Sequence, residues 1–202
     1  MKKRIATIKR KTKETDITVK LNIDGAGISK LNTGIGILDH MLELFAFHGL
    51  FDLDIFGKGD LKVDIHHTNE DIGIVLGEAF KGALGNKKGI HRFGSVSVPM
   101  EDVVANATVD ISGRGFFKFT KSGIYPDVIS DKEGYMLNDM EHFLESFAKH
   151  LGMNLNIMVN PISKDLHTTL EPIFKALGLA LDQATQIDPR RQGIPSTKGV
   201  ID

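Results

Sequence analysis

The chain has 202 residues, of which 25 are basic, 26 are acidic and none is cysteine. This length allows one generous domain or two small ones with a proper core, and the nearly neutral charge argues against a nucleic-acid or membrane-surface protein. Without cysteine, disulfides and thiolate metal sites are excluded. No apolar stretch forms a secretory signal or reaches the ~18 residues of a membrane span, so we expect a cytoplasmic protein.

The first half of the chain combines period-two and helical patterns. Its predicted elements are a hairpin over residues 2–23 that turns near Thr12–Glu14, a turn at Asp24–Gly27, a helix over Leu38–His48, a strand over Phe51–Phe56, a turn at Gly57–Asp60, an extended segment over Leu61–Ile65 and a helix over Glu70–Leu84.

The second half begins with two alternating segments, and Pro99 confines the first of them to a strand end or a sheet edge. The predicted elements are strands over Ser95–Met100, Val103–Ile111 and Phe116–Thr120, a loop over Lys121–Glu133, a helix over Leu137–His150, a strand over Leu155–Val159 and a helix over Leu166–Gln186. Pro172 is compatible with the first turn of the last helix, where no amide partner is lost.

The N-terminal segment is basic, with seven Lys or Arg among its first 13 residues. One interpretation is a nucleic-acid-binding arm. A solvated hairpin face explains the charges better, because no aromatic residue is interleaved for stacking on bases.

One stretch, Asp64–Asp71, combines two adjacent histidines with nearby carboxylates. In a helix, His66 and Glu70 share one face, and His67 is rotated from His66 by roughly 100°. Diverging histidines of this kind can reach two different metal ions, and imidazole with carboxylate suits manganese, iron or zinc. The alternative is an ordinary helix start capped by Thr68, which leaves the paired histidines without a reason.

The order of helix, strand, loop and histidine helix occurs twice, which indicates an internal duplication. Asp39–His48 corresponds to Glu141–His150 at an offset of 102 that also matches both histidines of each helix. His66 and Glu70 correspond to His167 and Glu171 at an offset of 101. We therefore predict two βα halves, residues 1–90 and 91–202, that together form one globular domain.

The duplication strengthens the metal hypothesis. Each half supplies a lone helix histidine and a histidine–glutamate pair, and His67 adds a further histidine that has Thr168 as its counterpart. Six histidines and two glutamates would fill two sites of three imidazoles and one carboxylate each. This chain supplies five histidines and two glutamates.

Several ordered blocks extend along almost the whole chain: Glu14-Thr15, Gly36–Leu42, His48-Gly49, Gly59-Asp60, His66–Gly73, Gly89–Gly94, Pro99-Met100, Asp110–Arg114, Glu141–Phe143, Glu171–Ala176 and Pro195–Val200. In these blocks the sequence resembles imidazoleglycerol-phosphate dehydratase, an enzyme family of histidine biosynthesis. So many blocks in one order make the resemblance highly specific.

The resemblance implies an α+β (two-layer α/β) fold, in which each half is a mostly antiparallel sheet with two helices on one face, as in ribosomal protein S5 domain 2. It implies a hydro-lyase that dehydrates imidazole glycerol phosphate to imidazole acetol phosphate, with the imidazolate held between two manganese ions. It also implies assembly into a 24-subunit shell, with sites built between subunits.

The resemblance assigns residues to each task. The implied metal ligands are His40, His66, His67, Glu70, His142, His167 and Glu171. The implied phosphate-binding residues are Arg92, Arg114, Lys175, Ser196 and Lys198, each of which would otherwise be interpreted as a surface or tail residue. The catalytic candidates are Glu14, which is also expected to contact the substrate, together with Glu70, Glu171 and His48. His48 and His150 follow a helical face and are explained equally well as structural residues.

One implied ligand is missing. The second motif is expected to read HHxxE, but Thr168 stands where its second histidine belongs, and the preceding loop Pro161–Asp165 also departs from the family pattern. Misalignment does not explain this, because Glu171–Lys175 fixes the frame. We therefore expect two manganese sites, one of them weakened by Thr168. The alternative is a catalytically impaired homologue that serves as a metal-binding or structural subunit. Gly115, where proline is usual, is a lesser departure.

Overall fold

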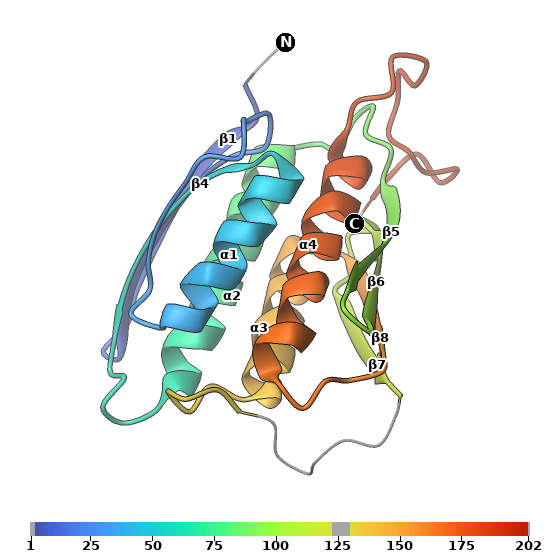
Figure 1. The fold of residues 1–202 in the computed structure, drawn as a ribbon. Coiled ribbons are helices and arrows are strands. Elements are labelled where there is room, and N and C mark those ends of the chain that lie inside the picture. The colour runs from blue at the N-terminus through green and yellow to red at the C-terminus, as the bar shows by residue number, and fades with distance from the viewer. Residues whose placement is uncertain (1–2, 123–129, 202) are drawn as a thin grey trace.

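In a computed structural model, which describes residues 3–122 and 130–201, four helices lie between two four-stranded sheets (Figure 1). The elements are β1 (Ile5–Lys11), β2 (Thr15–Asn22), β3 (Ser29–Asn32), α1 (Gly36–Gly49), β4 (Asp52–Gly59), α2 (Ile65–Leu84), β5 (Phe93–Met100), β6 (Val103–Asp110), β7 (Phe116–Lys121), α3 (Leu137–Leu151), β8 (Asn154–Asn160) and α4 (Leu166–Thr185). In the described part of the chain, no helix is long and apolar enough to cross a membrane.

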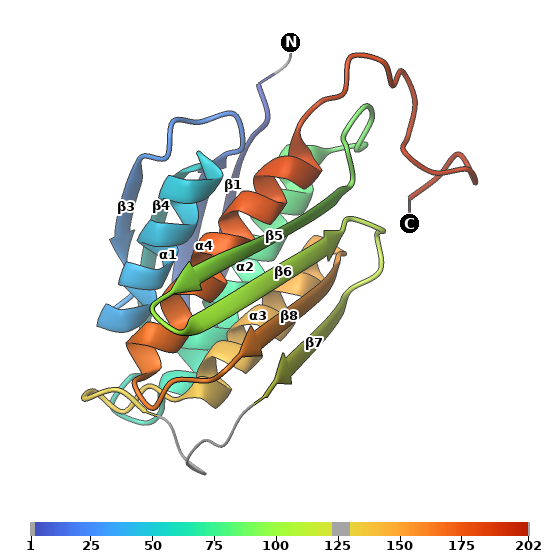
Figure 2. The same ribbon diagram turned by 45° about the vertical axis from the view of Figure 1, so that its right-hand side comes forward.

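The two sheets have the same topology, which confirms the predicted α+β fold with duplicated halves. The first has the strand order β1-β2-β4-β3 and the second β5-β6-β8-β7, so corresponding strands occupy corresponding places. In each sheet two antiparallel pairings are followed by one parallel pairing across a helical connection. Figure 2 shows the second sheet lying over α3 and α4. The exact division at residue 90 stays a prediction.

Alternation along the strands buries one face of each sheet against the helices. In β2, Ile17, Val19 and Leu21 are fully buried, and the polar residues between them face outward. Pro99 lies in β5, at an edge of the second sheet, as its missing amide requires. The helices carry the other half of the core, with large buried rings such as Phe45 and Phe147 packed edge to face.

Glycine allows the helices to approach one another closely. A Cβ atom on Gly77 of α2 would lie 2.7 Å from the carbonyl oxygen of Phe147 in α3, and one on Gly178 of α4 would lie 2.5 Å from that of Phe45 in α1. Gly77 and Gly178 are separated by the same 101 positions as the two histidine motifs. The duplication therefore extends to the helix contacts that place the motifs beside each other.

The structure corrects several predicted boundaries in the first half. β4 continues through Gly57–Gly59, where we predicted a turn, and the segment Leu61–Ile65 is a turn followed by the helix start rather than an extended segment. α2 begins at Ile65, five residues earlier than predicted, because Asp64 caps it by accepting a hydrogen bond from the amide of His66. Thr68 is thus buried inside the first turns and is not the cap.

Two further expectations require correction. The strand β3 was not predicted, because four half-exposed residues carry too little alternation to reveal it. Pro172 lies in the second turn of α4, not the first, so the helix loses one backbone hydrogen bond there. Of the predicted loop Lys121–Glu133, residues 123–129 lie outside the described residues, and Lys121 is the last residue of β7.

Candidate metal centre and substrate site

The ligand-type residues lie in the first two turns of four different helices, at the end of the molecule where all four helices begin (Figure 1). α1 carries His40, α2 carries His66 and Glu70, α3 carries His142, and α4 carries His167 and Glu171. The helix packing brings α1 beside α4 and α2 beside α3. Each pair of neighbouring helices therefore joins ligands from both halves of the chain.

The first group, which we call the α4 cluster, consists of His40, His167 and Glu171. The Nε2 atom of His40 lies 3.3 Å from Oε1 of Glu171, and Nε2 of His167 contacts the same oxygen. One ligand atom from each of the three residues lies within 4.8 Å of the other two. This arrangement fits a divalent cation, since two imidazole nitrogens and one carboxylate oxygen already converge.

Glu171 also binds Lys175, one turn further along α4, through its other oxygen. Burial favours the neutral acid, but hydrogen bonds from Lys175, His167 and His40 outweigh it and hold the pKa of Glu171 at about 2. The carboxylate is therefore ionised and available to a cation throughout the physiological range. The cluster opens into a cavity of about 660 Å³, which is also lined by Asp165 and residues 130–133.

The second group, the α2 cluster, consists of His66, Glu70 and His142. The Nδ1 atoms of His66 and His142 lie 3.2 Å apart, and Nε2 of His66 lies 3.3 Å from Oε2 of Glu70. Glu70 thus contacts the nitrogen of His66 that faces away from His142. The residues fit a cation in type and position, but among the described residues only the α4 cluster has all three ligand atoms converging.

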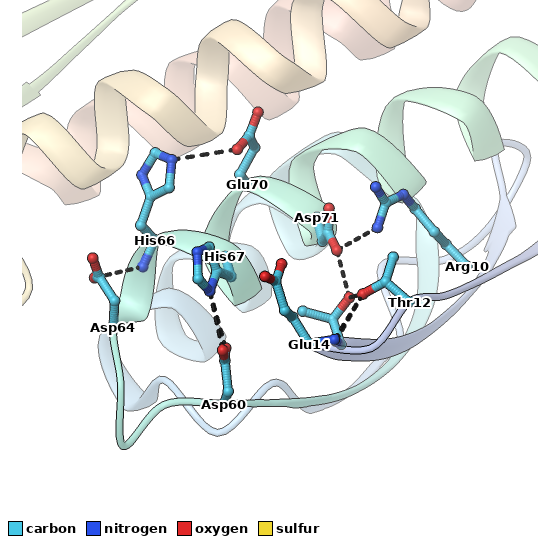
Figure 3. A network of polar contacts seen from close by, with 10 residues as sticks. Arg10, Thr12, Glu14, Asp60, Asp64, His66, His67, Glu70 and Asp71 are labelled. Atoms are coloured by element: carbon cyan, nitrogen blue, oxygen red, sulfur yellow. Dashed lines mark hydrogen bonds and ion pairs between the residues drawn. The ribbon is translucent and has the colours of Figure 1, made fainter.

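His67 points toward Asp60, whereas its neighbour His66 points toward Glu70 (Figure 3). Its Nδ1 lies 3.1 Å from Oδ2 of Asp60, at the end of β4, and this hydrogen bond raises the pKa of His67 above its ordinary value. Glu14, in the turn between β1 and β2, lies close enough for its charge to act on the same ring. The sequence alone indicates no role for Asp60, because only the fold brings it to His67.

Thr168 occupies the place in α4 that His67 occupies in α2. Its hydroxyl donates to Oδ2 of Asp165 over 2.7 Å, and its amide donates to the same oxygen over 2.8 Å. Asp165 is the N-cap of α4, so Thr168 forms part of an ordinary helix cap. At the position where the motif was expected to supply an imidazole, the structure therefore has the hydroxyl of Thr168, which is already hydrogen-bonded to Asp165.

Lys175 contacts Glu171 of the α4 cluster, but the other residues expected to bind phosphate show no contact with either cluster within one chain. Arg92 makes two hydrogen bonds to Asp110 and one to the carbonyl oxygen of Pro195, so it lies beside the C-terminal segment that carries Ser196 and Lys198. The amide of Arg92 donates to Ala184 near the end of α4. That position is about 20 Å along the helix from Glu171.

The remaining candidates have mixed surroundings. Arg114 is exposed in the turn after β6, and Lys175 alone of the phosphate candidates touches a cluster. His48 is half-buried beside the ring of Phe47, and burial, followed by the charge of Lys175, lowers its pKa. Gly115 has a packing reason, because a Cβ atom there would lie 2.3 Å from the Cα of Lys149 in α3.

We expect Glu171 to link stability to pH in the metal-free protein. Its folded-state pKa of about 2 lies below the ordinary 4.5, so its contribution to stability is present above pH 4.5 and is lost as the pH falls toward 2. The urea midpoint of the wild type should therefore fall more over this range than that of Glu171→Gln, whose side chain does not titrate. Parallel midpoint curves for the two proteins would contradict this linkage.

Comparison with known proteins adds independent information. The family model for imidazoleglycerol-phosphate dehydratase matches residues 33–181. The chain is 49% identical over 199 residues to the imidazoleglycerol-phosphate dehydratase of Pelobacter propionicus, covering 98% of this chain and 99% of that protein. It is 52% identical over 198 residues to that of Methanocella arvoryzae, covering 98% and 100%.

Solved structures agree with the sequence comparisons. A crystal structure of imidazoleglycerol-phosphate dehydratase from Staphylococcus aureus matches with a TM-score of 0.77 and 31% identity, covering 91% of this chain and 99% of that chain. The enzyme from Pyrococcus furiosus, in complex with (S)-C348, matches with a TM-score of 0.78 and 34% identity, covering 96% and 99%. Fold and sequence therefore point to the same relatives.

Proposed function

Because the chain belongs to the imidazoleglycerol-phosphate dehydratase family and is thus a hydro-lyase of histidine biosynthesis, we propose that it converts imidazole glycerol phosphate to imidazole acetol phosphate with the help of divalent metal ions. Manganese is the expected ion. A cytoplasmic location is expected of a biosynthetic enzyme that acts on a phosphorylated metabolite.

The observation that carries this proposal is the pair of clusters at one end of the helices. Each cluster joins two imidazoles and one carboxylate, and each takes its ligands from both halves of the chain. This donor set suits borderline divalent ions. When bound, such ions would supply Lewis acidity and a template that holds the imidazolate ring of the substrate.

The chain's own groups have to supply the proton transfers. The reaction removes a hydroxyl from one carbon and a proton from its neighbour, and no carbonyl acidifies that C–H bond. Glu14 is the first candidate for the acid–base group, because it is exposed beside His67 and takes part in no ion pair among the described residues. Glutamate carboxylates perform such transfers when they lie within hydrogen-bond reach.

Phosphate binding requires cations from outside the clusters. Arginine suits a phosphate by its two-pronged donor geometry, and lysine suits it as a point charge. Arg92 lies at the far end of α4, about 20 Å from Glu171, and contacts Pro195 of the C-terminal segment, so one chain does not bring Arg92 to the metal ligand that Lys175 contacts. We therefore propose that the complete site forms between copies in a large closed homo-oligomer, with 24 subunits as the family resemblance implies.

A single experiment tests function and assembly together. The purified protein with added manganese should turn over imidazole glycerol phosphate and should scatter light as a large oligomer. Chelation should stop turnover and weaken the assembly, because metal binding is then coupled to association. A chain of 22.2 kDa that stays monomeric with manganese would defeat the assembly proposal, and turnover that resists chelation would defeat the metal dependence.

A second candidate function deserves the same assay because of Thr168. A catalytically impaired homologue would bind metal and assemble but would not turn the substrate over. The observation in its favour is the hydroxyl of Thr168, which is committed to Asp165 instead of offering an imidazole. Assembly and metal binding without turnover would favour this alternative over the active dehydratase.

A further inference from the structure

His67 differs from the other ligand-type histidines in its surroundings. His40, His66, His142 and His167 each contact another member of a cluster in their own chain. His67 instead contacts Asp60 through Nδ1, and no described residue forms a hydrogen bond with its Nε2. Its side chain is 35% exposed, so this nitrogen is accessible from outside the chain.

Asp60 gives this accessible nitrogen a defined chemical state. A carboxylate that accepts from Nδ1–H leaves the lone pair of Nε2 free to bind a metal, and such outer carboxylates fix the tautomer and the orientation of ligating histidines. Figure 3 shows the result: His66 and His67 diverge, one toward Glu70 and the other toward Asp60. His67 is thus oriented as a ligand, but away from the clusters of its own chain.

The second half of the chain has lost both parts of this arrangement. α2 and α4 are both 20 residues long and correspond at an offset of 101, which makes Thr168 the counterpart of His67. The counterpart of Asp60 is Pro161 by the helix offset or Ile162 by the strand offset, and neither has a carboxylate. Asp165 accepts hydrogen bonds from both the hydroxyl and the amide of Thr168, so the side chain of Thr168 is used within the helix cap.

We propose that Asp60 is a positioning residue that fixes His67 as the one imidazole this chain supplies to a metal site of a second copy, and that Thr168 supplies none. This inference rests on the proposed metal dependence. Each chain holds two clusters of three ligands but offers only one further imidazole. In an assembly of identical chains, half of the metal sites therefore have a fourth protein ligand and half do not.

The consequence is one tight and one weak metal ion per chain. Losing even an outer partner of a metal ligand typically weakens metal affinity about 10–100-fold, so losing the imidazole itself should weaken it by at least as much. The test is the manganese content of the assembled protein after gel filtration in metal-free buffer, together with manganese titration by calorimetry. These measurements do not depend on turnover.

Reciprocal substitutions at the two equivalent positions, 67 and 168, give the sharpest comparison. The wild type should retain about one manganese ion per chain, Thr168→His about two, and His67→Thr, which copies the second half into the first, close to none. Asp60→Asn should weaken the tight site by about 10–100-fold, and Asp60→Glu should recover part of the loss. Asp54→Asn is the matched control, since Asp54 lies in β4, the strand that ends just before Asp60, and among the described residues it pairs only with the exposed Lys20.

The possible outcomes separate this inference from the proposed function. Two equally tight ions in the wild type, unchanged by Thr168→His, would overturn the inference and leave a metal-dependent dehydratase intact. Equal affinities for Asp60→Asn and Asp54→Asn would overturn the positioning role of Asp60. An assembled wild type that retains no manganese and turns over in the presence of a chelator would overturn the proposed metal dependence itself.

Discussion

Replacing Glu70 with glutamine should lower the turnover number by more than about 100-fold, even though the change removes no more than one charge. In the α2 cluster Glu70 is the only carboxylate, and its Oε2 lies 3.3 Å from the Nε2 of His66. A neutral amide is a poor ligand for a divalent cation, and two imidazoles alone do not offset the charge of the ion. Steady-state kinetics at saturating manganese measures the effect.

Two variants serve as comparisons for Glu70→Gln. Glu78→Gln makes the same chemical change two turns further along α2, where Glu78 forms no ion pair with any described residue, and it should leave turnover near the wild-type value. Arg92→Lys keeps the charge but loses the two-pronged donor, so it should mainly raise KM, by about tenfold. Near-normal turnover of Glu70→Gln would show that the α2 cluster is not a metal centre.

Most members of the two clusters could be predicted from the sequence, because the internal duplication is visible as a repeated pattern of histidine and glutamate. The constant offsets of 101 and 102 showed that His40 and His142 are equivalent, as are the pairs around Glu70 and Glu171. Period-two patterns then predicted strands whose apolar residues, such as Val19 in β2, are buried in the structure. These features depend on short-range spacing, which the chain reveals without any knowledge of tertiary contacts.

What the sequence could not show is which equivalent residues meet. The halves exchange partners: His142 of α3 meets His66 of α2, and His40 of α1 meets Glu171 of α4. That exchange follows from packing α2 on α3 and α1 on α4, where glycines allow close backbone approach. The start of α2 at Ile65 also differs from the predicted start at Glu70, because Asp64 and not a residue nearer Glu70 caps the helix.

The roles of Asp60 and Arg92 show the same limit. Asp60 is seven positions from His67 and reaches it only because β4 runs on to Gly59 before the chain turns back. Arg92 was expected to bind phosphate, a role that stays a prediction, and its contacts with Asp110 and Pro195 could not be foreseen. The contacts of Asp60 and of Arg92 depend on the path of the loops that carry them, and the spacing of residues in the sequence does not reveal that path.

Two histidines of α3 offer the clearest test of the exchange between halves. Both were found by the same repeat, and they lie eight residues apart on one helix, yet their surroundings differ. The Nδ1 of His142 lies 3.2 Å from that of His66, so it belongs to the α2 cluster. The Nδ1 of His150 lies 2.9 Å from the carbonyl oxygen of Ser146, one turn earlier, which is a bond within the helix.

We therefore expect opposite results from the same substitution at these two positions. His142→Ala should weaken manganese binding and turnover by more than about 100-fold, because it removes an imidazole from the cluster. His150→Ala should keep both within a few-fold, because only a contact within α3 is lost. Manganese titration and steady-state kinetics, with the thermal midpoint as the check on folding, measure the two effects. Equal losses at both positions would mean that the repeat marks a packing motif and that the contact of His142 with His66 is not a metal centre.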